Sequence, residues 1–349
     1  MSIQEDLQRS VAPAGAEPLE TGLEVLGAIE ARGYWESVWR SFKRDKVAIG
    51  GGVTIILLIV ACYAGGPLFS RILGHGPDRL YDGAVTAGGN PIGPWAHFKN
   101  APYVGATGHF PTVFFPLGAD GAQGRDEFLR LLYGGQVSLE VAVLATFVSI
   151  VLGVVLGAAA GYFGGLIDMI ISRITELIMA FPLILFMIAL SAVAGPQLNN
   201  ITFGFLQHGV FTITMVLSVF GWFYPARIAR AQVLSLREKE FIEAARMVGS
   251  SDLRILRSHL LPHLVAPMIV LGTINVGQNV LAEAGLSFLG IGIQDPTASW
   301  GNLLEQAPTY YLQVPWLMLW PGLAILITTL AFNLLGDGLR DAFDPRTAQ

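Results

Sequence analysis

The segment between residues 240 and 262 reads Glu240-Phe-Ile-Glu243-Ala244-Ala245-Arg-Met-Val-Gly249-Ser-Ser-Asp252, then Leu253 to Ser258, then His259-Leu-Leu261-Pro262. Its first part holds good helix formers. Gly249 can end that helix, because glycine adopts the left-handed conformation freely. Ser250, Ser251 or Asp252 can cap a second short helix, which Pro262 ends. The sequence therefore predicts two short helices joined at a glycine, although the pattern alone is also compatible with an ordinary amphipathic loop.

Long blocks without charge lie on both sides of this segment. Of the 349 residues, 53% are hydrophobic and only 13% are charged, whereas soluble domains carry about 25% charged residues. Asp, Glu, Lys and Arg are absent from Val47 to Ser70, Val141 to Ile167, Leu177 to Ala226, Ser258 to Ala282 and Gln306 to Gly336. A helix needs roughly 20 apolar residues to cross a bilayer. Five such blocks are too many for the core of one globule, so the fold class is an all-α membrane protein.

The blocks predict six transmembrane helices. The longest block contains the turn signals Gly195-Pro196 and Asn199-Asn200, so it divides into two spans. The expected spans are 47–69, 137–161, 169–194, 210–234, 264–286 and 314–335.

The distribution of Lys and Arg sets the orientation. These residues are abundant before the first span, between spans four and five, and after the last span. On the opposite side they occur only in one long loop, and long loops escape the positive-inside rule. We expect a multi-pass protein of the cell inner membrane with both termini in the cytoplasm.

A helix with Trp35, Val38, Trp39 and Phe42 on one face is expected to lie at the membrane interface. With this helix included, the chain divides into five parts. The parts are a disordered cytoplasmic tail (1–34), the interfacial helix and first span (35–69), an extracytoplasmic loop (70–136), a five-span core (137–336) with a cytoplasmic loop at 235–263, and a cytoplasmic tail (337–349).

The 240–262 segment resembles the "EAA" loop of ABC importer permeases. It has Glu-Ala-Ala, three residues, Gly, nine residues, and then a residue followed by x-Leu-Pro, without a gap. The resemblance implies the type I ABC importer permease fold, in which this loop docks into a groove of the ATPase subunit. It implies ATPase-coupling roles for Glu243, Ala244, Ala245, Gly249, Leu261 and Pro262.

Other segments resemble the dipeptide, oligopeptide and nickel permeases, and among these the C-type subunit. They are Pro116-Leu-Gly118-Ala-Asp120, Gly161-Tyr-Phe-Gly-Gly165, Glu283-Ala-Gly-Leu-Ser-Phe-Leu-Gly290 and Gly336-Asp337-Gly338-Leu-Arg340-Asp341. The chain departs from the family pattern in the spacing between Asp120 and Gly124, in having Phe115 where His is expected, and in a longer 74–114 segment. The departures therefore all lie in the outer loop.

This resemblance implies the partners. They are a second permease subunit, two ATP-binding subunits that hold ATP and Mg, an extracytoplasmic solute-binding protein, and membrane lipid. The chain itself is expected to have no catalytic activity, no cofactor and no nucleic-acid partner. The implied cargo is a peptide, with nickel or an oligosaccharide as the alternative. A self-contained channel or ion-coupled carrier is a further alternative, but it should carry carboxylates deep in several spans.

Gly153, Gly157 and Gly161 recur at helical spacing in the second span. Small residues four apart let helices approach closely in lipid, so we expect helix packing. A phosphate-binding loop is the alternative, but the sequence contains no Gly-Lys-Ser/Thr.

Asn275, Asn279 and Glu283 form one polar stripe on the fifth span. Polar groups within a span usually face the bundle interior or a water-filled path. The stripe therefore lines a translocation path or makes hydrogen bonds to a neighbouring span, and the sequence leaves both open.

Charged and imidazole side chains near the membrane boundary suggest other roles. Arg173 and Glu176 can pair on one helix face and, with Asp168, act as a gate or an interfacial anchor. His259 and His263 have the spacing of a metal pair, but Pro262 lies between them and no third ligand is near, so we predict no metal site.

Overall fold

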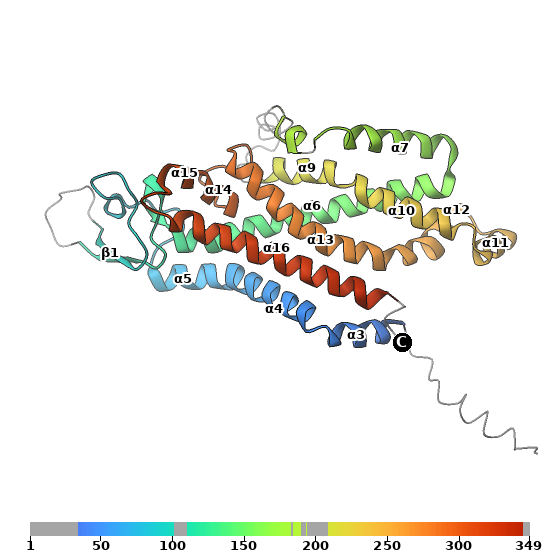
Figure 1. Cartoon of the computed structure of the whole chain (residues 1–349), viewed down its shortest axis with the longest axis horizontal. Coiled ribbons are helices and arrows are strands. Elements are labelled where there is room, and N and C mark those ends of the chain that lie inside the picture. The colour runs from blue at the N-terminus through green and yellow to red at the C-terminus, as the bar shows by residue number, and fades with distance from the viewer. Residues whose placement is uncertain (1–33, 101–109, 183, 190–192, 194–208, 345–349) are drawn as a thin grey trace, which may run out of the picture.

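A bundle of long, roughly parallel helices forms most of the computed structural model, with a small outer part at one end and a short two-helix projection at the other (Figure 1). The structure describes residues 34–100, 110–182, 184–189, 193 and 209–344. The predicted disorder of 1–34 therefore falls almost wholly outside the described residues. Within them, five helices are long and apolar enough to cross a membrane: Lys46–Leu73, Glu127–Phe163, Val210–Leu236, Asp252–Phe288 and Trp316–Phe343.

These five helices correspond to five of the six expected spans. The remaining one, 169–194, begins in α7 (Gly165–Met179), and part of it lies outside the described residues. The span expected at 169–194 therefore stays a prediction, while the all-α membrane architecture is confirmed.

The chain enters the bundle through α3 (Tyr34–Arg44), a short helix at the same end as the C-terminal part of α16 (Figure 1). The Trp35 ring packs edge-on against Phe343 at 6.1 Å, while the Trp35 and Trp39 side chains remain largely exposed. Asp45 then caps α4 (Lys46–Val60) by accepting hydrogen bonds from the Val47 and Ala48 amides. A π-helical segment, η1 (Ala61–Gly65), and α5 (Gly66–Leu73) complete the first span.

The outer part contains two small antiparallel hairpins. Strand β1 (Ala96–Lys99) pairs with β2 (Thr112–Phe115), and β3 (Ala119–Asp120) pairs with β4 (Arg125–Asp126). The short 3-10 turn η2 (Asp82–Ala84) precedes β1 in the chain, and η3 (Gly121–Gln123) connects β3 to β4. Tyr81, Ala84, Phe115 and Ala119 form their common apolar core. The sequence did not predict these strands, because each is only two to four residues long and short apolar runs carry little periodicity.

Helix α6 (Glu127–Phe163) begins well before the expected start of the second span at 137. The Asp126 carboxylate caps it by accepting hydrogen bonds from the Phe128 and Leu129 amides, and burial raises the pKa of Asp126 to about 7. The helix therefore extends beyond the expected span, and Arg130 in this added stretch has a fully buried, ion-paired side chain.

The middle of the chain supplies α9 (Val210–Gly221) and α10 (Phe223–Leu236), which pack on α6. The two-helix projection consists of α11 (Glu240–Met247) and α12 (Asp252–Ile255), followed by the π-helical segment η4 (Leu256–Leu260) and α13 (Leu261–Phe288). The short helices α14 (Trp300–Glu305) and α15 (Ala307–Tyr310) return the chain to α16 (Trp316–Phe343).

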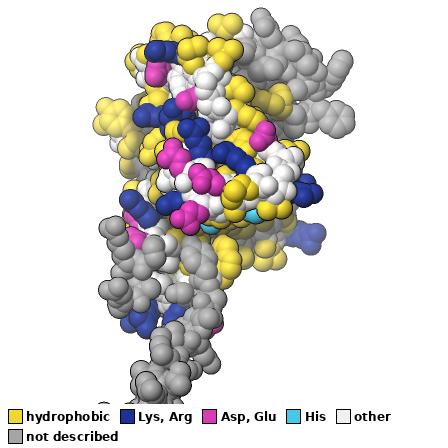
Figure 2. All heavy atoms as spheres, turned by 90° about the vertical axis from the view of Figure 1, so that its right-hand side faces the viewer, with side chains coloured by type: hydrophobic (Ala, Val, Ile, Leu, Met, Phe, Trp, Pro, Cys, Tyr) yellow, Lys and Arg dark blue, Asp and Glu magenta, His cyan; other side chains and the backbone are white. Residues whose placement is uncertain are grey.

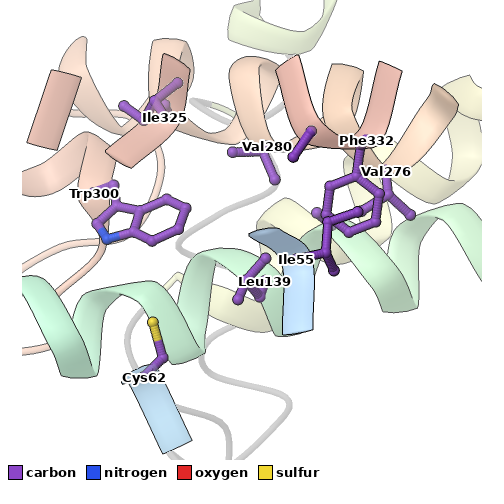
Figure 3. Packing of buried hydrophobic residues seen from close by; sticks show 11 residues of the cluster. Ile55, Cys62, Leu139, Val276, Val280, Trp300, Ile325 and Phe332 are labelled. Carbon is purple, nitrogen blue, oxygen red and sulfur yellow. The ribbon is translucent and has the colours of Figure 1, made fainter. Parts of the chain in front are cut away.

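The main apolar core lies where α4, α6, α13 and α16 meet. Figure 3 shows Ile55, Leu139, Val276, Val280 and Phe332 in this core, with Trp300 and Cys62 on its outer side. The Trp300 indole N–H donates to the Leu131 carbonyl at 3.0 Å, so the polar group of this large buried side chain is hydrogen-bonded.

Candidate functional site

The two-helix projection at one end of the bundle is a knob built around Gly249. We use coupling knob for residues 240–262. Gly249 has φ 80°, its amide donates to the Arg246 carbonyl at 2.9 Å, and the Ser250 amide donates to the Ala245 carbonyl at 3.0 Å. This is the paired hydrogen-bond pattern of a Schellman cap, which satisfies the last carbonyls of α11. The left-handed residue is therefore required to turn the chain between the two helices.

The second half of the coupling knob differs from the expectation. Pro262 does not end a helix, because α12, η4 and α13 form one unbroken helix from Asp252 to Phe288. Proline is tolerated here since it lies in the first turn of α13, directly after a π-helical turn that changes the local hydrogen-bond pattern. The knob is thus a direct extension of a membrane-crossing helix.

The inner face of the knob is anchored on the bundle. Ile242, Ile255 and Leu260 are fully buried in one cluster with side chains of α6, α10 and α13. The Tyr162 hydroxyl, at the end of α6, donates to the Asp252 carboxylate at 2.6 Å, and the Arg246 guanidinium lies over the same ring at 5.5 Å. The knob is therefore held in one orientation relative to α6.

The outer face of the knob, which points away from the bundle, is exposed rather than buried. Met247, Val248 and Leu253 are 83%, 86% and 75% exposed. Figure 2 looks onto this end of the molecule and shows basic and acidic side chains gathered there with hydrophobic side chains between them. Exposed apolar side chains with a charged rim are the expected features of a protein-binding surface.

The predicted coupling residues divide between these two faces. Glu243, Ala244, Gly249 and Pro262 are exposed, whereas Ala245 and Leu261 are half-buried and pack against the inner cluster.

The glycine stripe of α6 lies directly against α10. A Cβ at Gly153 would lie 2.5 Å from Pro225 Cβ, a Cβ at Gly157 would overlap the Ala226 carbonyl, and a Cβ at Gly161 would lie 2.9 Å from the Arg230 carbonyl. The missing side chains therefore allow the two helix backbones to touch.

The polar stripe of α13 does not act as one unit. Asn275 and Asn279 line a cavity of about 490 Å³ together with Gln278, Tyr224 and side chains of α6, α9 and residues 184–187. We call this the polar cavity. The Asn279 amide also donates to the Thr146 hydroxyl at 2.8 Å, so lining a cavity and bonding to a neighbouring helix occur together at this residue.

Glu283 lies apart from that cavity. It is fully buried and accepts hydrogen bonds from the Ser138 and Ser287 hydroxyls, each at 2.8 Å. Ser138 in turn accepts from the Trp300 amide. Glu283 thus joins α6, α13 and the start of α14 near the outer end of the bundle.

The charged side chains at the inner end pair in a way that the sequence only half predicted. The predicted pair of Arg173 and Glu176 is confirmed at 2.8 Å, and both side chains are largely exposed. Asp168 instead pairs with Arg230 of α10, with Nη2 to Oδ2 at 2.7 Å. That guanidinium holds the pKa of Asp168 below its usual value. Sequence separation hid this contact, because nothing local links residues 168 and 230.

Within the described residues, His, Cys, Asp and Glu side chains form no group of three that could hold a metal ion. His263 instead packs its ring against Phe241 at 5.8 Å.

The structure is thus a helical membrane bundle with a polar cavity between its helices and an anchored knob at one end. Residues 153–349 match the family described as "Binding-protein-dependent transport system inner membrane component", and residues 33–82 match the "N-terminal TM domain of oligopeptide transport permease C". The chain belongs to this family of ABC importer permeases.

Several characterised proteins are similar to the chain. The dipeptide transport system permease protein DppC of Alkalihalophilus pseudofirmus is 42% identical over 314 residues, which is 89% of this chain and 90% of that protein. The glutathione transport system permease protein GsiD of Escherichia coli is 36% identical over 318 residues, covering 91% and 92%. A chain of the MetNI methionine ABC transporter is similar at 19% identity and a TM-score of 0.47, over 61% of this chain and 95% of its own length.

Proposed function

We propose that this chain is one of two permease subunits of an ATP-driven peptide importer and that it forms half of the translocation path. Similarity to permeases named for dipeptide and glutathione transport, over most of the chain, supports a peptide cargo. Nickel and oligosaccharides remain the alternative cargo for the same architecture.

The partners follow from this role. A second permease subunit completes the path, two ATP-binding subunits hold ATP and Mg, and a solute-binding protein delivers the cargo from outside. The N- and C-termini lie in the cytoplasm, on the same side as the coupling knob.

The observation that carries the proposal is the outer face of the coupling knob. Met247, Val248 and Leu253 are exposed there, beside the exposed Glu243. Apolar exposure of this kind, on a segment whose opposite face is firmly packed, favours docking of a partner. We assign the ATP-binding subunit as that partner.

The continuous helix from Asp252 to Phe288 connects the knob directly to the proposed transport path. The same helix carries Asn275 and Asn279 on the wall of the polar cavity. A movement of the docked knob would therefore displace that wall. Coupling also requires that the ATP-binding subunit contact the knob differently in its two states.

The test is uptake by the reconstituted complex. Vesicles containing this chain, its sister permease and both ATP-binding subunits are given the solute-binding protein and a mixture of labelled di- to pentapeptides. We expect peptides to accumulate only with ATP. Accumulation of nickel or an oligosaccharide instead would overturn the cargo, and peptide flux that persists without ATP would overturn the mechanism in favour of a channel or carrier.

A further inference from the structure

A second cavity lies closer than the polar cavity to the end of the bundle that carries the coupling knob. It has a volume of about 360 Å³ and lies between α6, α7 and α10. We call it the arginine cavity, since Arg227 and Arg230 line it together with Ser172, Thr175 and Glu176.

The charges around the arginine cavity leave one cation without an anion. Arg230 is paired with Asp168, and Glu176 is paired with Arg173. Arg227 has only the Met179 sulfur as a hydrogen-bond partner, at 3.4 Å, and within the described residues no carboxylate lies within 4.0 Å of it. The cavity therefore carries a net positive charge, which belongs to Arg227.

The two cavities share one face of α10. Tyr224 lines the polar cavity, and Arg227, one turn further along the same helix, lines the arginine cavity. Three residues of a helix advance by about 4.5 Å. Tyr224 and Arg227 therefore place the two cavities about one helical turn apart along α10.

The polar groups that line the two cavities differ, since those of the polar cavity are neutral and those of the arginine cavity include two guanidinium groups. Amide and hydroxyl side chains at the centre suit the uncharged peptide groups of a substrate. A guanidinium at the end suits a carboxylate, because it donates two parallel hydrogen bonds to the two oxygens.

Resting on the proposed function, we propose that Arg227 is a substrate-binding residue that receives the C-terminal carboxylate of a peptide in the arginine cavity. The site would prefer peptides with a free carboxylate over C-terminal amides, independently of any preference of the solute-binding protein. The phosphate of an inner-leaflet lipid is the competing occupant.

Binding to the nucleotide-free complex in lipid nanodiscs, without the solute-binding protein, tests this assignment. Tri-alanine and tri-alanine amide are titrated separately by calorimetry. We expect the free acid to bind wild type about tenfold more tightly than the amide, which is the effect of one charge-assisted contact. Arg227→Gln should lower the affinity for the acid about tenfold and leave that for the amide within twofold, and Arg227→Lys should keep most of the preference.

Arg173→Gln is the matched control. It removes the same charge at the same end of the bundle, but Arg173 does not line the cavity. We expect wild-type affinities for both peptides.

Three results would overturn the assignment. They are equal or undetectable binding of acid and amide by wild type, an equal loss for both in Arg227→Gln, and a loss of bound phosphatidylglycerol in Arg227→Gln with peptide binding unchanged. The wild-type comparison requires no variant to fold. ATP-driven peptide uptake by the same complex is measured separately, so a failure of the importer itself is distinguishable from a failure of this site.

Discussion

The two ends of the bundle differ in which side chains they bury: one buries a charged group, and the other leaves apolar groups exposed. At the outer end, Arg130 is fully buried and ion-pairs with Asp78, Asp120 and Asp295, which come from three separate parts of the chain. At the opposite end, the coupling knob leaves Met247 and Val248 almost fully exposed. The outer end is thus held together by contacts within this chain, whereas the knob leaves an apolar surface exposed.

The substitution with the largest expected effect on stability lies at the outer end. Arg130→Met would remove one of the two buried guanidinium groups that pair with Asp120 and Asp295, and Arg125 would remain the partner of both. Removing one member of a buried ion pair costs about 3–5 kcal/mol. Thermal unfolding of the purified subunit should show a large drop in midpoint. Arg173→Met is the control, because its pair with Glu176 is exposed and such pairs contribute about 0–1 kcal/mol. Equal drops in the two variants would contradict the difference in burial.

The next effect concerns the middle of the bundle. Gly157→Leu would force α6 away from the Ala226 backbone of α10, and overpacking costs about 1–3 kcal/mol. We expect a lower unfolding temperature and less assembled complex. Gly50→Leu is the matched control, since a Cβ there has nothing within 4 Å. Normal assembly and transport by Gly157→Leu would show that the glycine stripe has no packing role.

These two sites also mark what the sequence could predict. The glycine spacing in α6 identified a close-packing face from local pattern alone. The partner helix could not be predicted, because Pro225 and Ala226 belong to a distant segment with no local link. The burial of Arg130 could not be predicted for the same reason, since the carboxylates that pair with it lie at residues 78, 120 and 295.

The cytoplasmic and central sites follow the same rule. The turn at Gly249 was predictable, because only a few residues tolerate positive φ and the flanking segment favours a helix. The end of the second helix at Pro262 was predicted wrongly, since proline in a first turn does not stop a helix. Glu283 appeared to continue the Asn275–Asn279 stripe, but three-dimensional packing placed it among serine hydroxyls instead.

A smaller, functional effect is expected in the polar cavity. Asn279→Leu removes a polar group from the cavity wall and its hydrogen bond to Thr146. We expect peptide uptake to fall several-fold while the ATP-binding subunits still copurify. Thr146→Val is the control, because it removes only the hydrogen bond. If both variants lose uptake equally, the hydrogen bond rather than the cavity surface explains the role of Asn279.

The smallest effect is expected at the anchor of the knob. Tyr162→Phe keeps the ring beneath Arg246 but removes the hydroxyl that donates to Asp252. One such hydrogen bond contributes about 1 kcal/mol net. We expect subunit association to be retained and stimulation of ATP hydrolysis by loaded solute-binding protein to fall about twofold. Unchanged stimulation would mean that the inner apolar cluster alone fixes the knob.

The substitution Gly249→Val tests the central claim, that the coupling knob joins this chain to an ATP-binding subunit. A Cβ at Gly249 meets no atom within 4 Å, so any defect arises from the backbone at φ 80° rather than from a clash. A β-branched residue is strongly disfavoured there, whereas asparagine tolerates it. Gly165→Val places a similar strain at φ 53°, outside the knob and equally free of contacts.

The measurement is copurification of the ATP-binding subunits together with hydrolysis stimulated by loaded solute-binding protein. We predict that Gly249→Val inserts and pairs with its sister permease but loses association or stimulation at least tenfold. Gly249→Asn and Gly165→Val should stay close to wild type. Wild-type values for Gly249→Val in both assays would contradict the assignment of the knob as the coupling element.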